Sequence, residues 1–201
     1  MICLYSPTTV KRVYIASEEV RWNGYYNTLQ ITQERECNLS NRRRGPAELL
    51  DSLMAVLEEL GGLKYVRLAS GRRICYKEQG VRREEAKRQL MVLHGLGSSR
   101  LASMPGVSDT LLKAYGVKIV AIDRPGYGRS DCDTEQTFKS SVQDIEEVAD
   151  ALSMGDKFWL LGYSCGGAFC WACARYIPHR LAGVCLWAPA GNYYWKVNYI
   201  T

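Results

Sequence analysis

Gly162-Tyr163-Ser164-Cys165-Gly166 is the stretch of this sequence that decides the fold. It follows the apolar run from Lys157 to Leu161 and leads into a second apolar segment, from Gly166 to Ile177. The first run predicts a buried strand and the second predicts a helix, so the serine lies on a sharp strand-to-helix turn. The glycines on either side leave room for the strand and the helix to approach closely. Ser164 is therefore a candidate nucleophile, exposed above the edge of a sheet.

The segments around this turn alternate between strand and helix patterns. Alternating apolar residues predict a hairpin over residues 64–78, with Ser70-Gly71 as its turn. Further strands are predicted at residues 89–93, 117–122 and 181–187, and helices at residues 110–115 and 138–152. Such alternation is typical of an α/β fold with a mostly parallel, doubly wound sheet. In such a fold the ligand-binding loops lie at the carboxyl ends of the strands.

Three chemically distinctive loops fall at that edge of the predicted sheet. They are His94-Gly-Leu-Gly-Ser-Ser99, Asp123-Arg-Pro-Gly-Tyr-Gly-Arg-Ser-Asp131 and the turn at Ser164. A nucleophilic serine needs a base to take its proton and backbone N–H groups to stabilise an oxyanion. The helix that starts behind Ser164 offers the amide of Cys165, and the first loop offers the amide of Leu96. We predict these two backbone groups as the oxyanion donors.

With Ile177-Pro-His-Arg-Leu-Ala-Gly183 and Trp187-Ala-Pro-Ala-Gly191, these loops occur in the order seen in the α/β-hydrolase fold superfamily. Within it, the chain resembles plant-type soluble serine hydrolases with an AB hydrolase-1 domain, over about residues 64–195. The resemblance implies that Ser164 is the nucleophile and that Leu96 and Cys165 form the oxyanion hole. It also implies that Asp123 shapes its loop and takes no catalytic part.

The acid and the histidine of such a site are not found in the expected places. In this family both follow the serine in chain order, but no Asp or Glu follows Ser164. Of the two histidines, His94 is expected to brace its loop, and His179 belongs to a turn at the opposite sheet edge. We therefore expect a truncated chain whose hydrolase fold is incomplete after its sixth strand. Because loss of a whole triad costs ~10⁶ in kcat, the chain alone is expected to be nearly inactive.

Three readings of the function remain open at this point. The first is a serine hydrolase that acts on an ester, thioester or amide through an acyl-enzyme on Ser164. The second is a non-catalytic ligand-binding protein or receptor on the same scaffold, which tolerates a missing base. Another chemistry on this scaffold, such as that of a lyase, is a third and less supported reading. The expected partner is a small acyl substrate or ligand, and no cofactor or metal is predicted.

The chain divides into three predicted parts. Residues 1–45 form a poorly patterned N-terminal extension, residues 46–62 an amphipathic helix, and residues 63–201 the partial hydrolase domain. With no later strand in the pattern, residues 181–187 are expected to form an apolar, unpaired sheet edge. Such an edge invites self-association.

Composition favours a cytoplasmic protein without nucleic-acid or membrane partners. The formal charge is +5, but acidic residues stand beside the arginine clusters and dilute any basic patch. The 17 uncharged residues 158–174 are interrupted by the turn at Ser164, so we predict no membrane span. Eight cysteines lie mostly in apolar patterns, as expected for reduced, buried thiols. Cys170 and Cys173 lie in mid-helix, which indicates core packing rather than a redox or zinc site.

Overall fold

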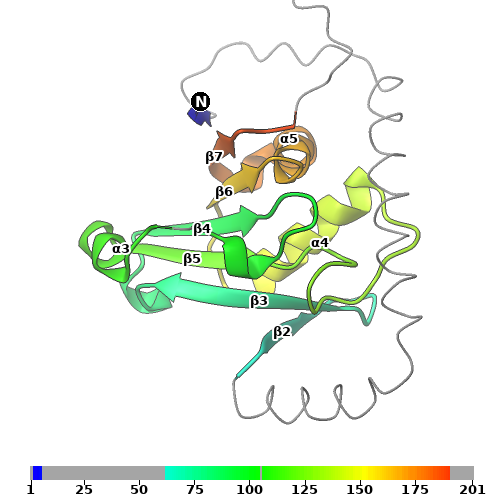
Figure 1. Cartoon of the computed structure of the whole chain (residues 1–201), viewed down its shortest axis with the longest axis horizontal. Coiled ribbons are helices and arrows are strands. Elements are labelled where there is room, and N and C mark those ends of the chain that lie inside the picture. The colour runs from blue at the N-terminus through cyan, green and yellow to red at the C-terminus, as the bar shows by residue number, and fades with distance from the viewer. Residues whose placement is uncertain (1, 6–61, 105, 191–201) are drawn as a thin grey trace, which may run out of the picture.

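The computed structural model describes residues 2–5, 62–104 and 106–190. This part of the chain forms a seven-stranded sheet in the order β1-β7-β6-β4-β5-β3-β2 (Figure 1). The strands are β1 (Ile2–Tyr5), β2 (Lys64–Arg67), β3 (Arg73–Gly80), β4 (Arg88–Leu93), β5 (Val117–Ile122), β6 (Phe158–Tyr163) and β7 (Leu181–Trp187). The helices are α3 (Asp109–Tyr115), α4 (Phe138–Ala151) and α5 (Gly166–Tyr176), with short 3₁₀ turns η1 (Arg83–Glu85), η2 (Arg100–Ala102) and η3 (Pro178–Arg180).

The four central strands β5, β4, β6 and β7 run parallel, whereas the pairings of β1, β2 and β3 are antiparallel. Side chains alternate across the sheet, as the period of a strand requires. On β4, Met91 and Leu93 join the core under α4 and α5, while Val92 joins the core under α3. Helices therefore cover both faces, and the predicted α/β fold with a mostly parallel sheet is confirmed.

The predicted elements correspond closely to the observed ones. The strand bounds at residues 117–122 and 181–187 agree, and the predicted hairpin is the β2–β3 pair. Its turn residue Gly71 has a φ of +86°, a left-handed conformation that glycine adopts without steric cost. The predicted helix 46–62 apart from Gly62, and the extension 1–45 apart from residues 2–5, lie outside the described residues.

The prediction of an unpaired sheet edge at residues 181–187 is wrong. Strand β1 pairs antiparallel with β7, in a register that runs from Ile2 opposite Trp187 to Tyr5 opposite Val184. The backbone groups of β7 on that side therefore have strand partners, and the self-association expected from that edge loses its basis. Strand β1 was not predicted, because a segment of four residues is too short to show a period.

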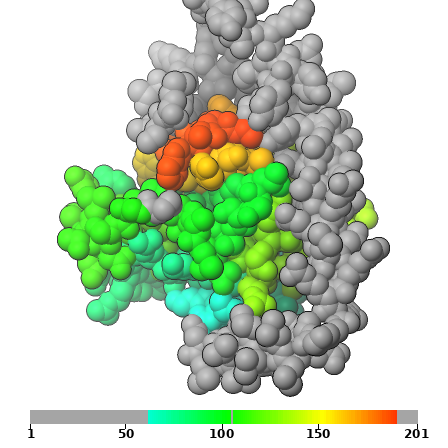
Figure 2. Space-filling view, viewed as in Figure 1, coloured from blue at the N-terminus to red at the C-terminus, as the bar shows by residue number. Residues whose placement is uncertain are grey.

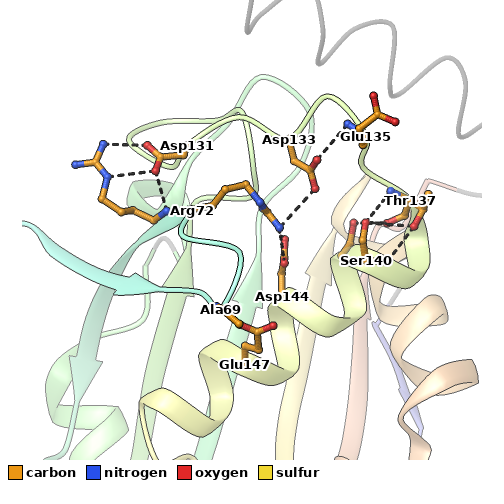
Figure 3. Close-up of polar contacts among 11 residues, drawn as sticks. Ala69, Arg72, Asp131, Asp133, Glu135, Thr137, Ser140, Asp144 and Glu147 are labelled. Carbon is orange, nitrogen blue, oxygen red and sulfur yellow. Dashed lines mark hydrogen bonds and ion pairs between the residues drawn. The ribbon is translucent and has the colours of Figure 1, made fainter.

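A polar cluster ties the hairpin to helix α4 (Figure 3). The two terminal nitrogens of Arg72 donate to the carboxylate of Asp144 at 2.9 and 2.7 Å, in a bidentate pair. Asp133 lies 3.5 Å from the same guanidinium, and Glu147 accepts from the backbone N–H of Ala69 at 2.8 Å. Burial raises the pKa of Asp144, and the bond from Arg72 opposes that rise. The cluster thus joins residues that are more than 70 positions apart in the chain.

Replacing this arginine should make stability depend more strongly on pH. In Arg72→Met the buried carboxylate of Asp144 loses its partner, and its pKa rises further above the unfolded value. A raised carboxyl pKa favours folding at low pH, and that contribution is lost as the pH rises through the folded-state pKa. We expect a loss of about 3 kcal/mol at neutral pH and a much smaller loss near pH 4, measured by urea unfolding.

Arg83→Met, which changes an arginine of η1 with a half-exposed side chain, is the matched control. It should alter the free energy of unfolding by less than about 0.5 kcal/mol at either pH. A loss for Arg72→Met that is independent of pH would contradict the assigned pairing.

Candidate active site

Ser164 lies on the turn between β6 and α5, at the carboxyl end of a parallel strand. Its φ is +50°, a left-handed conformation that costs a non-glycine residue about 1–3 kcal/mol. Backbone bonds hold this conformation: the N–H of Ser164 donates to Trp187 at 3.1 Å, and its C=O accepts from Ala190 at 2.9 Å. The turn is as sharp as the sequence predicted, and Cys165 is the N-cap of the helix that follows.

Two glycines allow this turn to pack. A Cβ at Gly166 would overlap the carbonyl oxygen of Leu93, at the end of the neighbouring strand β4. A Cβ at Gly162 would lie 2.6 Å from the Sγ of Cys170 and from the backbone of Gly166. Helix α5 therefore sits directly on strands β6 and β4, closer than any larger residue would permit.

The loop after β4 lies against the serine. A Cβ at Gly95 would come within 3.1 Å of the Cβ of Ser164 and 3.3 Å of the ring of Tyr163. The next residue, Leu96, is 48% exposed. Since β4 and β6 are adjacent, with Leu93 opposite Gly162, the three predicted site residues Ser164, Cys165 and Leu96 gather at one sheet edge. In the space-filling view the red surface towards the end of the described chain borders green surface from the middle of the sequence (Figure 2).

The carboxylate of Asp123 is fully buried at the end of β5 and organises the neighbouring loops. One oxygen accepts from the backbone N–H of Arg100 at 2.6 Å. The other accepts from the guanidinium of Arg100 at 2.5 Å and from the backbone N–H of Arg129 at 2.9 Å. These bonds use both carboxylate oxygens within the loops, which agrees with the shaping role expected for Asp123.

His94 is buried, and backbone groups occupy both of its ring nitrogens. Nε2 accepts from the N–H of Arg124 at 3.1 Å, so the proton is on Nδ1, which donates to the carbonyl of Gly95 at 2.7 Å. Burial, with the charge of Arg124 as a second cause, lowers the pKa of His94 to about 3. A neutral imidazole with both nitrogens engaged braces the loop, as the sequence analysis expected.

The second histidine lies at the other edge of the sheet. His179 belongs to η3, which immediately precedes β7, whereas Ser164 follows the carboxyl end of β6. It borders an open groove with Asp150, Asp156 and Arg180. Lys157 is likewise exposed at the start of β6. Neither histidine of the chain is therefore placed to take a proton from Ser164.

Two residues near the turn were missed by the sequence analysis. Arg124 is 3% exposed and donates to the carbonyls of His94 and Gly95. Tyr163 is 43% exposed, and the centroid of its ring lies 5.4 Å from that of Trp187. The two rings form an aromatic pair, and the ring of Tyr163 lies beside Gly95. Arg124 could have been identified from its position directly after Asp123, in a loop that the sequence already marked as chemically distinctive.

The cysteines require one correction. Cys170 and Cys173 are buried in α5, and burial raises the pKa of both thiols, which fits the expected packing role. Cys132, in contrast, is disulfide-bonded, so the expectation of reduced thiols is wrong at this position. Within the described ranges, no helix is long and apolar enough to cross a membrane.

Residues 89–196 match the alpha/beta hydrolase fold family, and the chain belongs to that family. Solved structures support the same fold. A predicted CIB-like hydrolase from Thermoplasma acidophilum is 20% identical with a TM-score of 0.52, and the match covers 64% of this chain and 63% of that one. An enol-lactonase from Burkholderia xenovorans LB400 is 21% identical with a TM-score of 0.52, over 59% of this chain and 44% of that one.

A hydrolase from Pseudomonas aeruginosa PA01 is 23% identical with a TM-score of 0.50, over 60% of this chain and 43% of that one. The matched part of this chain thus spans between 43% and 63% of these three solved chains. At such identities the likeness concerns the fold.

Substitution of Gly166 should disrupt the turn. In Gly166→Ala the new methyl group meets the carbonyl of Leu93, which is backbone and yields little. We expect a loss of at least about 3 kcal/mol in the free energy of unfolding, measured by urea titration. Gly71→Ala is the control, because its φ is +86° but no atom lies within 4 Å of the added Cβ. It should cost about 1–2 kcal/mol, and equal losses for both variants would refute the packing argument.

The low pKa of His94 predicts a pH-dependent stability. Its folded pKa of about 3 lies below the ordinary value of 6.5, so the folded state binds fewer protons than the unfolded state. The resulting stability is present above the ordinary value and is lost as the pH falls from there towards the folded pKa. In His94→Asn this titration is absent, and unfolding free energies between about pH 7 and about pH 4 should change less than in the wild type. A wild-type pH dependence that persists in His94→Asn would contradict this assignment.

Proposed function

We propose that this chain carries the nucleophile and oxyanion half of a serine hydrolase site. Ser164 attacks the carbonyl of an ester, thioester or amide and forms an acyl-enzyme. The observation that carries this proposal is the strained backbone of Ser164 at the carboxyl end of β6, against which the loop of Gly95 packs. A serine held in this way presents its hydroxyl at the edge where ligands of parallel sheets bind.

The oxyanion of the tetrahedral intermediate is assigned to two backbone groups. The N–H of Cys165 belongs to the first turn of α5, whose N-terminus carries a partial positive charge. The N–H of Leu96 belongs to the loop that contacts Ser164 through Gly95. Donors of this kind act where negative charge develops, and loss of one typically costs ~10²–10³ in kcat.

The proton of Ser164 needs an acceptor, and neither histidine of the sequence is placed to take it. His94 has both ring nitrogens engaged, and His179 lies at the opposite edge of the sheet. The carboxylates of the sequence all precede Ser164. Full activity on this proposal requires a base other than these two histidines and an acid that orients it. An oxyanion hole and binding alone leave ~10³–10⁴ over the reaction in water.

The placement of the histidines also favours a second candidate function. A protein that binds an acyl compound or another small ligand without turning it over needs the residues that contact the ligand, but it needs no base. The exposed side chains of Tyr163 and Leu96 beside Ser164 suit contact with an apolar ligand group. Binding without turnover, seen as thermal stabilisation by a ligand, distinguishes this candidate from the hydrolase.

Covalent labelling tests the nucleophile. A fluorophosphonate probe should modify the 201-residue chain slowly and at a single residue, because the oxyanion donors are present and the base is not. Mass spectrometry of the digested protein should place the adduct on Ser164. Ser164→Ala should abolish labelling, and Ser98→Ala, which changes a half-buried serine in the neighbouring loop, should leave it intact.

Turnover of an activated ester by the same preparation should be ~10⁶-fold slower than with a complete triad, and at most ~10³–10⁴-fold faster than the reaction in water. Labelling that persists in Ser164→Ala would rule out this serine as the nucleophile. Rapid turnover by the wild type that survives in Ser164→Ala would place the chemistry elsewhere in the protein.

A further inference from the structure

The carbonyl of Gly95 receives two hydrogen bonds from the buried side of its loop. The Nδ1–H of His94 donates to it at 2.7 Å, and an Nη2–H of Arg124 donates at 3.1 Å. Arg124 also donates through Nε to the carbonyl of His94 at 3.2 Å, and through its own backbone N–H to Nε2 of His94 at 3.1 Å. One arginine and one histidine therefore fix two consecutive peptide groups.

The second of these peptides ends in the N–H of Leu96. A peptide unit is planar and almost always trans, so its C=O and N–H point in opposite directions. Arg124 is 3% exposed and Leu96 is 48% exposed, so the carbonyl points inward and the amide points outward. A Cβ on Gly95 would lie 3.1 Å from the Cβ of Ser164, so this peptide lies beside the serine. Fixing the carbonyl thereby fixes the direction of the amide assigned to the oxyanion.

The guanidinium is itself held by aromatic rings. It lies 4.4 Å from the ring centroid of Tyr127 and 4.8 Å from that of Phe169. Phe169 belongs to α5, the helix that begins behind Ser164 and carries the other assigned donor, Cys165. Arg124 thus contacts both the loop of Leu96 and the helix of Cys165.

We propose that Arg124 is a positioning residue that orients the Leu96 amide toward the oxyanion and keeps it in register with α5. The inference rests on the proposed function for the identity of the oxyanion site. The planar fork of arginine reaches two carbonyls at once and stacks on rings, whereas the ammonium group of lysine is a single point charge. Donors on a carbonyl also polarise the peptide, which strengthens its N–H as a donor.

Nuclear magnetic resonance of the isotope-labelled 201-residue chain tests this without any turnover. In Arg124→Met, whose side chain keeps the apolar stem, the carbonyl ¹³C signal of Gly95 should move upfield because one donor is lost. The order parameter of the Leu96 amide should fall from about 0.85 towards 0.6 or below. In Arg124→Lys both changes should be smaller, since the charge and one possible bond remain.

Arg72→Met is the matched control. It removes another largely buried arginine, whose ion pair with Asp144 does not touch the loop of Gly95. It should destabilise the protein and leave both signals unchanged. If Gly95 and Leu96 keep their wild-type values in folded Arg124→Met, the positioning role is overturned. If that variant does not fold, Arg124→Lys decides by the same signals, and wild-type values there overturn the proposal.

Fluorophosphonate labelling separates this inference from the proposed function. Where the wild type reacts at Ser164, Arg124→Met should react about 10- to 100-fold more slowly, and Arg72→Met should match the wild type. Equal labelling rates for Arg124→Met and wild type would refute the positioning role while leaving Ser164 as the nucleophile. If Ser164 does not react even in the wild type, the nucleophile assignment fails, and the two resonance signals still decide whether Arg124 orients the peptide.

Discussion

The close approach of helix α5 to strand β4, made possible by Gly166, is the constraint on which the rest of the structure depends. The backbone of the helix lies where a Cβ would overlap the carbonyl of Leu93. The chain leaves β4 at that carbonyl and enters the loop of Gly95, so the same contact places the loop beside Ser164. The strained turn, the helix N-terminus and the loop are therefore fixed together, and none of them can shift without the others.

Two consecutive residues after β5 complete this arrangement with opposite charges. Asp123 holds the far end of the loop through Arg100, and Arg124 holds the near end through two carbonyls. Both side chains are buried, which is costly for charged groups unless hydrogen bonds satisfy them. The loops themselves supply these hydrogen bonds, so the two charged side chains hold the backbone of the loops in place. His94 belongs to the same hydrogen-bond network as a neutral ring.

Much of this fold was predictable because the signals were local. The alternating pattern around Gly71 and the β-branched run 117–122 identify strands without any distant partner, and the turn at Ser164 carries its own glycines. The location of the candidate site at one sheet edge followed from the order of those strands. Strand β1 and the contacts of Arg124 were missed because they depend on residues far apart in the chain, for which no local period exists.

The pairing of β1 with β7 has a consequence for how the sheet is assembled. It joins Ile2 to Trp187, two residues that lie far apart in the chain. During synthesis residues 2–5 must wait until the central parallel strands and β7 have emerged. Pairing between residues so far apart in the chain carries a cost in loop-closure entropy, which rises slowly with the separation. Contacts of this kind also slow folding. One border of the sheet is therefore completed only after nearly the whole of its interior has been made.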